Sequence, residues 1–452
     1  MGVCVEDTAR APPGQTRTGS SGPLGAKTEP APPGRYNPGF TNARRTPYMA
    51  APLDGIRVLE VANWLAAPAA TALMADLGAD VIKVEPPGGD VFRQFQLRSM
   101  GYDYDFPTNY GFQTDNRGKR SVTVSLDRPG GPDLVRKMAA SADIFVTNLI
   151  QERRVKYGLT YEDVAAVKPD GVYVSFSGYG TRGPDANRAG FDFAAFWAAS
   201  GVMGLLAEPD APPPLCRGGQ GDHSTALNIL AATLAALRLR DSTGQGQHVE
   251  TTLQASGMWT IAGDFSAALA ARSNAPRISR KAPTNPIWNT YQCSDGDWIL
   301  LVMPLPFPAY WGRFCAMVER PEWADDPRWN SLPGIRQHTA MLTAMIEPLF
   351  AAQPKARWMK KLDEHGLIWA PVATTQEVIA NPQVREMGWI AEIDHPEFGK
   401  FETLDTPFKI YGSETGARGP APDAGQHTFE LLAEFGIDGD ALSELATNGV
   451  IG

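Results

Sequence analysis

The feature that most constrains the fold of this chain is a regular alternation of apolar runs with helix-forming segments. Residues 55–61 form an apolar run of strand length, residues 66–77 are rich in Ala and Leu, and residues 80–85 form a second strand that ends before Pro86. The alternation continues through predicted strands at 120–126, 143–148 and 171–177, with helices at 131–141 and 161–167. Strands that alternate with helices predict a parallel sheet with helices on both faces, a Rossmann-like α/β fold.

The turn after the first strand does not have the glycines of a dinucleotide-binding protein. Residues 62–68 read Ala-Asn-Trp-Leu-Ala-Ala-Pro. A phosphate-binding turn at this point would read Gly-x-Gly-x-x-Gly. The sequence therefore disfavours a nicotinamide or flavin oxidoreductase.

Changes in composition along the chain predict its domain organisation. Residues 1–50 are rich in Pro and Gly and lack hydrophobic periodicity, which is typical of a disordered segment. Translation that begins at Met49 is the preferred explanation for them, and a transit peptide is the weaker one. Further on, a Ser-Asp-Gly turn predicts a hairpin over 288–303, followed by helices at 309–318, 338–350 and 355–365. We expect an N-terminal extension at 1–50, a large Rossmann-like domain at 51–255, a helical linker at 256–287, a small α+β domain at 288–375, and a return to the large domain with C-terminal helices at 376–452.

Charge and cysteine content disfavour several classes of protein. The chain has 50 Asp and Glu against 41 Lys and Arg, a formal net charge of −9, which argues against nucleic acid or an anionic membrane as a partner. No apolar run approaches the roughly 18 residues of a membrane span. The 4 cysteines form no CxxC pair and the first of the 6 histidines is His223, so no zinc site or disulfide framework is indicated. We expect a cytoplasmic protein without a metal.

The strongest candidate for a catalytic segment is the glycine cluster that ends in Asp222. Residues 218–222 read Gly-Gly-Gln-Gly-Asp and precede a helix predicted over 222–240. One interpretation is structural, because Asp is a preferred N-cap residue. The other is that small residues such as Gly221 clear space around a carboxylate that acts as a nucleophile toward an acyl group.

A second acid, two basic clusters and an aromatic segment are further candidates. Asp192 precedes a hydrophobic helical run and is interpreted either as an N-cap or as a group that holds a ligand or moves a proton. Arg93 with Arg98, and the basic run at 117–120, are either solvated surface or sites for a phosphorylated cofactor. The aromatic residues of 102–110 are either packing residues or the wall of an acyl pocket.

Several of these segments, taken in order, resemble the class III CoA-transferases, the family of formyl-CoA transferase and carnitine-CoA transferase. The resemblance covers about residues 51–440. It rests on seven segments: PLDGIRVLE at 52–60, LGADVIKVE at 77–85, NRGKRSVTVSLD at 116–127, SGYGTRGP at 177–184, GFD at 190–192, TGQGQ at 243–247 and GQHT at 425–428.

The resemblance implies a function, a set of site residues and an assembly. It implies transfer of CoA from an acyl-CoA to a small free carboxylic acid, with Asp222 as the nucleophile and an interlocked homodimer as the functional unit. Succinyl-CoA is the first guess for the donor. Asp192 and Gly221 are expected to support Asp222. The residues expected at the CoA site are Lys83, Arg93, Asn148, Leu149 and Lys156, and those expected at the substrate pocket are Trp64, Leu65 and Tyr102.

The chain also departs from the family pattern, and other activities are weighed against transfer. Leu65 stands where formyl-CoA transferase has a glutamine, which favours an acyl group larger or less polar than formate. The glycine-rich flap of formyl-CoA transferase has no counterpart in 251–290. An α-methylacyl-CoA racemase is the alternative activity, but Phe191 replaces the histidine that precedes its aspartate. A non-catalytic acyl-CoA-binding protein is disfavoured because Asp222 is present.

Overall fold

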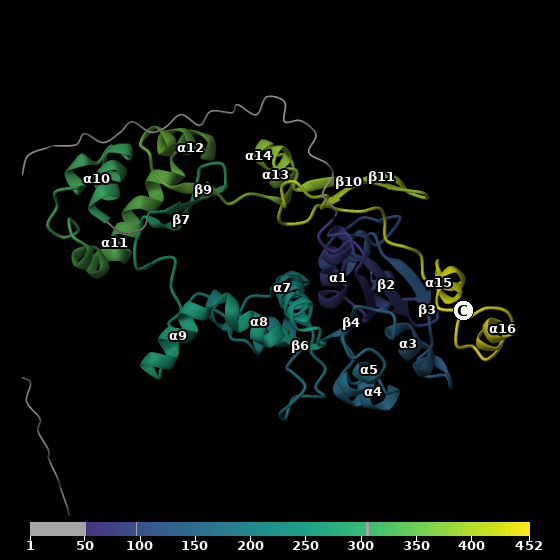
Figure 1. The fold of residues 1–452 in the computed structure, drawn as a ribbon. Helices are drawn as coiled ribbons and strands as arrows, with labels where there is room; N and C mark the ends of the chain where they lie inside the picture. Colours follow the sequence, from purple (N-terminus) through teal and green to yellow (C-terminus); the bar gives the residue numbers. More distant parts are fainter. Residues whose placement is uncertain (1–50, 96, 304–306) are drawn as a thin grey trace, which may run out of the picture. The chain divides into compact units, whose positions relative to one another are not determined.

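The central element of the fold is a six-stranded sheet in which every neighbouring pair of strands is parallel. The computed structural model describes residues 51–95, 97–303 and 307–452, so the extension predicted at 1–50 lies outside the described residues. The strands are β1 (Arg57–Val61), β2 (Asp80–Glu85), β3 (Arg120–Thr123), β4 (Ile144–Thr147), β5 (Val172–Ser177) and β6 (Gln247–Thr252), in the order β3-β2-β1-β4-β5-β6 (Figure 1). The predicted Rossmann-like parallel sheet is thereby confirmed. The chain changes direction between β1 and β4, where open α/β sheets bind their ligands.

Helices cover both faces of this sheet because successive strand residues point in opposite directions. Val58 of β1 packs in a core with α1 (Ala66–Asp76) and α7 (Gln220–Thr243). Leu59 packs in the opposite core, which includes residues of α3 (Gly131–Ala139), α5 (Tyr161–Val167) and α15 (Thr428–Glu434). Both strand faces are apolar, as expected for a parallel sheet that is buried on two sides.

The C-terminal residues are part of the core of the large sheet. Leu431 and Val450 lie in the same apolar cluster as Val122 of β3. The backbone N–H of Thr123 donates to the Thr428 hydroxyl at 3.1 Å. Residues about 300 positions apart in the sequence therefore complete one edge of the sheet.

A second core forms around a small antiparallel sheet. Its strands are β7 (Trp288–Gln292), β8 (Trp298–Val302) and β9 (Trp369–Pro371), and they pack with α10 (Phe307–Met317), α11 (Leu332–Ala351) and α12 (Lys355–Glu364). The hairpin predicted over 288–303 is confirmed. The helix predicted at 338–350 begins earlier, at Leu332, because the Ser331 hydroxyl accepts from the Gly334 N–H and Pro333 fits the first turn.

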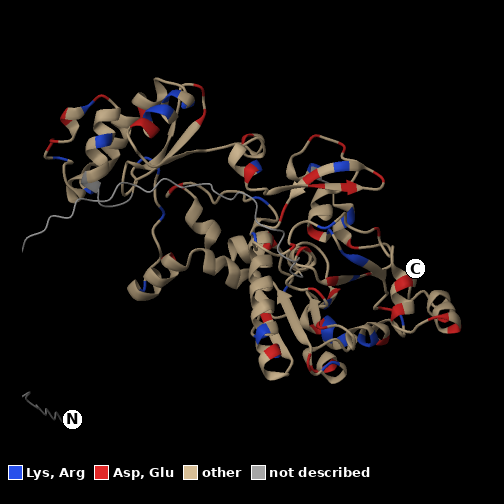
Figure 2. Ribbon diagram, turned by 45° about the horizontal axis from the view of Figure 1, so that its top comes forward, with Lys and Arg blue, Asp and Glu red and all other residues tan. Residues whose placement is uncertain are grey.

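The remaining elements are short helices and one hairpin. They are α2 (Tyr110–Asn116), α4 (Gln151–Tyr157), α6 (Val202–Leu206), α8 (Leu253–Thr260), α9 (Ala262–Ala271), α13 (Thr375–Ile379), α14 (Pro382–Glu386), α16 (Gly439–Thr447), and the antiparallel strands β10 (Ile390–His395) and β11 (Gly399–Leu404). No described helix is long and apolar enough to cross a membrane. Lys and Arg residues are interspersed with Asp and Glu along the ribbon (Figure 2).

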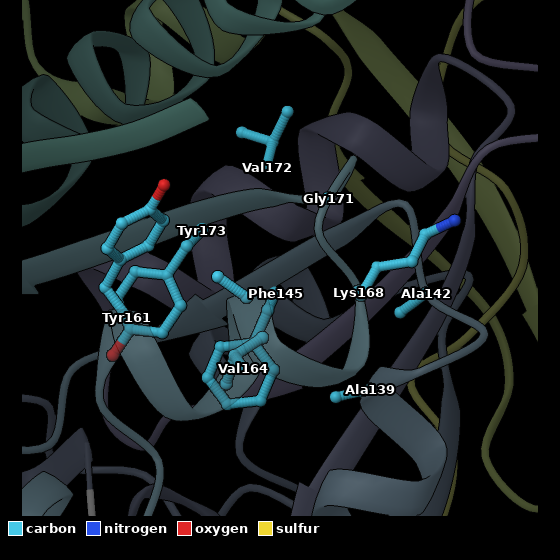
Figure 3. Close-up of a pocket in the computed structure, with 10 residues that line it drawn as sticks. Ala139, Ala142, Phe145, Tyr161, Val164, Lys168, Gly171, Val172 and Tyr173 are labelled. Atoms are coloured by element: carbon cyan, nitrogen blue, oxygen red, sulfur yellow. The ribbon is translucent and has the colours of Figure 1, made fainter. Parts of the chain in front are cut away.

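The packing between α5 and the sheet leaves little free space. Tyr161 and Val164 of α5 lie beside Phe145 of β4 and Tyr173 of β5 (Figure 3). The cavity that they line has a volume of about 10 Å³, which is room for one water molecule at most. The contact between α5 and these two strands is therefore close-packed core.

A buried ionic cluster joins β1, β2 and the residue that precedes β3. The Glu60 carboxylate lies 2.7 Å from the Lys83 ammonium and 2.7 Å from the Lys119 ammonium, and all three side chains are fully buried. Burial alone would raise the pKa of Glu60, but Lys119 and Lys83 outweigh it and lower that pKa to about 2. Lys83 also lies 2.8 Å from Asp90, which extends the cluster toward the turn after β1.

Removal of the central charge should destabilise the protein strongly. Glu60→Gln leaves two buried ammonium groups with too little negative charge, so we expect a loss of about 3–5 kcal/mol in the free energy of unfolding. The exposed pair Glu392–Lys400 provides the control, and Glu392→Gln should cost less than about 1 kcal/mol. Urea unfolding followed by tryptophan fluorescence measures both. Equal losses in the two variants would contradict a structural role for the cluster.

Candidate active site

Asp222 lies in the first turn of α7, and glycine backbone geometry places it there. The helix begins at Gln220, and its N-cap is Gly219, which has a left-handed φ of 85°. The prediction that Asp222 itself caps the helix is therefore wrong. Glycine adopts this conformation without the steric cost of a Cβ, so it can precede the helix directly.

Asp192 and Gly221 fix the start of α7 against a neighbouring segment. Asp192 is the first residue of a π-helical segment, Asp192–Ala198, and its buried carboxylate accepts from the Gly219 N–H at 2.6 Å. It does not cap its own segment, whose N-cap is Phe191, so that expectation is corrected. A Cβ on Gly221 would lie 2.2 Å from Asp192 Oδ1 and 2.3 Å from Phe196 Cγ. Gly221 therefore allows the close approach of the two segments.

The Asp222 carboxylate is placed among other acids and has no hydrogen-bond partner within the described residues. Burial, followed by the negative charges of Asp192 and Asp115, raises the pKa of Asp222 to about 7. Burial likewise raises the pKa of Asp192. A carboxylate that is desolvated and not engaged in hydrogen bonds keeps its lone pairs available for reaction.

A histidine–aspartate pair lies next to Asp222 and was not among the predicted site residues. The His223 ring Nε2 lies 2.9 Å from Oδ1 of Asp115, the buried acid near the end of α2. Burial would lower the pKa of His223, but Asp115 outweighs it and raises that pKa to about 9. His223 is therefore a cation at neutral pH. Its adjacency to Asp222 was visible in the sequence, whereas Asp115 is distant in the chain and carried no local signal.

Aromatic rings gather at the turn after β1, close to the start of α7. Trp64 contacts Phe95 and Phe191, with ring centroids 6.3 and 5.5 Å apart. Leu65 reaches the glycine cluster, because a Cβ on Gly219 would lie 3.7 Å from Leu65 Cδ1 and also 3.7 Å from the His223 ring. Two of the three residues predicted for the substrate pocket therefore lie at this apolar surface.

The third predicted pocket residue lies in a different aromatic group. The Tyr102 ring contacts Phe106, with centroids 6.0 Å apart. Within the described residues it makes no ring contact with Trp64. Tyr102 and Trp64 therefore do not belong to the same ring cluster.

The turn that carries Trp64 is held in an unusual conformation. Trp64 has a φ of 68°, in the left-handed region that bulky residues rarely adopt. Its N–H donates to Asp90 Oδ1 at 3.3 Å, and Asp90 is in turn held by Lys83. The buried ionic cluster thus helps to hold this turn in its strained backbone conformation.

Two asparagines join the segments that follow β1 and β4, the place where open sheets of this order form a ligand-binding crevice. The Asn148 amide nitrogen donates to the Asn63 carbonyl at 2.7 Å, and the Asn63 N–H donates to Asn148 Oδ1 at 3.2 Å. The Asn63 side-chain oxygen is buried without a hydrogen-bond partner. Asn148 therefore lies at the position where a parallel sheet of this order binds ligands, and the buried Leu149 follows it directly.

The basic residues predicted to contact CoA differ in their availability. Lys83 is fully buried and paired with Glu60 and Asp90, so in this structure it is a structural cation and not a ligand contact. Arg93 is engaged by Glu85 at 2.6 Å. Lys156 is exposed on α4, where it pairs with Asp127 at 2.7 Å. Of the three, Lys156 is the most accessible.

These contacts assemble a half-buried carboxylate, a neighbouring cation and an apolar surface at the start of one helix. Such an arrangement suits attack by Asp222 on an activated acyl group. Among the described residues, no group of three or more His, Cys, Asp or Glu side chains is arranged to hold a metal ion.

Three relatives similar along almost their whole length carry transferase names. A cinnamoyl-CoA:phenyllactate CoA-transferase of Clostridium sporogenes is 29% identical over 396 residues, 87% of this chain and 95% of that protein. A succinyl-CoA:glutarate CoA-transferase of Mus musculus is 30% identical over 402 residues, 88% of this chain and 90% of that protein. An (R)-2-hydroxy-4-methylpentanoate CoA-transferase of Clostridioides difficile is 27% identical over 403 residues, 88% and 99% respectively. These names do not favour the racemase alternative.

The fold and a family model agree with this similarity. The crystal structure of a CAIB/BAIF family protein from Brucella suis matches with a TM-score of 0.75 and 30% identity, covering 86% of this chain and 100% of that one. The model of CoA-transferase family III matches residues 53–428. The chain therefore belongs to CoA-transferase family III, as the resemblance in its sequence motifs predicts.

Proposed function

We propose that this protein moves CoA from an acyl-CoA to a free carboxylic acid through a covalent intermediate on Asp222. The observation that carries the proposal is the Asp222 carboxylate, which is half-buried at the start of α7 and makes no hydrogen bond to another described residue. The transferase names of the relatives support the same reaction class. The racemase alternative is not retained.

The reaction proceeds by exchange of acyl groups and conserves the thioester. Asp222 attacks the thioester carbonyl, the C–S bond breaks, and a mixed anhydride and the CoA thiolate form. The thiolate attacks the aspartyl carbonyl, which releases the donor acid as its carboxylate and leaves an aspartyl-CoA thioester. The acceptor carboxylate then attacks this thioester, the C–S bond breaks, and a second mixed anhydride and the CoA thiolate form. The thiolate attacks the acceptor acyl carbon of this anhydride, which gives the new acyl-CoA and releases the Asp222 carboxylate.

The apolar surface beside Asp222 supports an acyl group larger and less polar than formate. Trp64, Leu65 and Phe191 offer rings and a methyl-bearing side chain. The relatives named for cinnamoyl-CoA with phenyllactate and for a branched 2-hydroxy acid carry substrates of this kind in their names. We infer an aromatic or branched acyl group at this surface.

The proposal also includes a binding site for CoA and a second subunit. The crevice at Asn148 and Leu149, with Lys156 nearby on α4, is the proposed CoA site. The proposed assembly is an interlocked homodimer, supported by α9, which buries none of its residues although it is rich in Ala and contains Leu269. Cover from a second subunit would also exclude water from the anhydride.

Covalent capture tests the nucleophile directly. Intact-mass analysis of the protein mixed with succinyl-CoA, cinnamoyl-CoA or formyl-CoA should show an adduct that maps to Asp222. Asp222→Asn should lose the adduct and at least about a thousandfold in turnover, because the nucleophile is gone. The exposed Asp185, which pairs with Arg188, provides the control variant Asp185→Asn. An adduct retained in Asp222→Asn, or solvent deuterium at the acyl α-carbon, would contradict the proposal.

The rate should depend on pH through Asp222. Only the carboxylate is nucleophilic, so kcat/KM for the acyl-CoA should fall as the pH drops through about 7. Asp192→Asn keeps an oxygen that accepts from Gly219 but removes a charge that raises the pKa of Asp222. The midpoint should therefore move to lower pH in that variant. An unchanged midpoint would show that another group controls the rate.

Donor preference should depend on Trp64. Trp64→Asn keeps a residue that tolerates the left-handed backbone but removes the ring. We expect kcat/KM for cinnamoyl-CoA to fall about tenfold more than kcat/KM for succinyl-CoA, given typical ring-contact energies. Tyr104→Ala, at an exposed ring that contacts Phe106, is the control. Equal loss for both donors would argue against an acyl contact at Trp64.

A further inference from the structure

The His223–Asp115 pair presents one fixed cation beside the nucleophile. Asp115 is almost fully buried and holds Nε2 of His223 at 2.9 Å, whereas the His223 side chain is 53% exposed. One edge of the ring is thus anchored in the protein and part of the ring reaches solvent. A ring held in this way is oriented before any ligand arrives.

The negative charges around Asp222 indicate a role for the His223 cation in binding an anion. Asp222, Asp192 and Asp115 place three carboxyl groups close together, and each of the other two raises the pKa of Asp222. Within the described part of the chain, His223 is the one cationic side chain that lowers the pKa of Asp222. An incoming carboxylate would be repelled by these acids unless a cation met it.

The side chain that lies across Gly219 from His223 provides no polar contact for an anion. Leu65 approaches the same glycine, Gly219, from the turn after β1 and has no hydrogen-bonding group. Arg93 is occupied by Glu85, and Lys83 is buried in the ionic cluster. The charged ring of His223 is therefore the group best placed to receive an anion near Asp222.

We propose that His223, oriented by Asp115, binds the carboxylate of the acceptor acid next to Asp222. The proposal rests on the transfer reaction proposed above and assigns a binding residue for its second substrate. Because the donor acid leaves from the position that the acceptor enters, His223 also contacts the released donor carboxylate. The two acids therefore share one subsite, and free CoA does not use it.

Steady-state kinetics of His223→Gln test this assignment. The donor and acceptor are the pair that wild type turns over fastest among succinyl-CoA, cinnamoyl-CoA and formyl-CoA as donors with glutarate, phenyllactate and oxalate as acceptors. We expect the KM of the acceptor acid and the inhibition constant of the released acid to rise together by about tenfold or more, the scale of a hydrogen bond to a charged group. The Kd of free CoA, measured by calorimetry, should stay within about twofold.

Asp115→Asn separates a charge effect from a structural one. His223 faces Asp115 from α2, Asp222 from its own helix and Asp192 from the π-helical segment, while Lys119 lies close enough to Asp115 for their charges to interact. Without the Asp115 charge, the pKa of His223 should fall from about 9 toward its ordinary value. The acceptor KM of Asp115→Asn should then be close to wild type at pH 6 and close to His223→Gln at pH 8.5.

A control variant and the Asp222 adduct distinguish a failure of the His223 assignment from a failure of the proposed transfer reaction. Ser224→Ala, which removes only a hydroxyl bonded to the Gln220 carbonyl, should leave every constant unchanged. An acceptor KM within twofold of wild type in His223→Gln would overturn the assignment, as would equal weakening of CoA and both acids. If wild type forms no Asp222 adduct with any of the three donors, the transfer mechanism fails and the assignment fails with it.

Discussion

The buried pairing of Glu60 with Lys83 and Lys119 is the interaction on which the active-site region depends. It joins β1, β2 and the residues before β3 at the edge of the sheet where the first turn leaves the core. Lys83 also forms an ion pair with Asp90, and Asp90 accepts a hydrogen bond from the backbone N–H of Trp64. Charges that would be costly to bury separately are here mutually compensated, and they set the position of a strained turn.

A second constraint comes from the absence of a side chain at Gly221. It lets the segment that begins at Asp192 approach α7 so closely that the Asp192 carboxylate bonds the Gly219 backbone. The start of α7 is thereby fixed before a substrate arrives, and Asp222 takes its orientation from the helix. Pre-organisation of this kind reduces the entropy lost when a reacting group is brought to its target.

The sequence predicts the large sheet well because its signals are local and repeated. Strands such as 80–85 can be recognised from a few consecutive residues and the turn residues that flank them. The helix predicted at 338–350 begins six residues earlier in the structure, at Leu332. The site was predicted in part. Asp222 could be proposed from the sequence because a glycine cluster precedes it, whereas Asp115 contacts His223 across 108 positions of sequence and had no local signal. Lys83 is the converse case. Its sequence motif suggests ligand binding, but in the folded structure its side chain is buried against Glu60 and Asp90.

The contact between β3 and α15 bears on how the protein is made. Thr123 and Thr428 are 305 positions apart, yet they bond each other at the edge of the main sheet. During synthesis, β3 must therefore wait for residues that are translated about 300 positions later. Until then the apolar face around Val122 lacks the cover of Leu431 and Val450. A truncation before α15 would accordingly expose a sheet edge prone to aggregation.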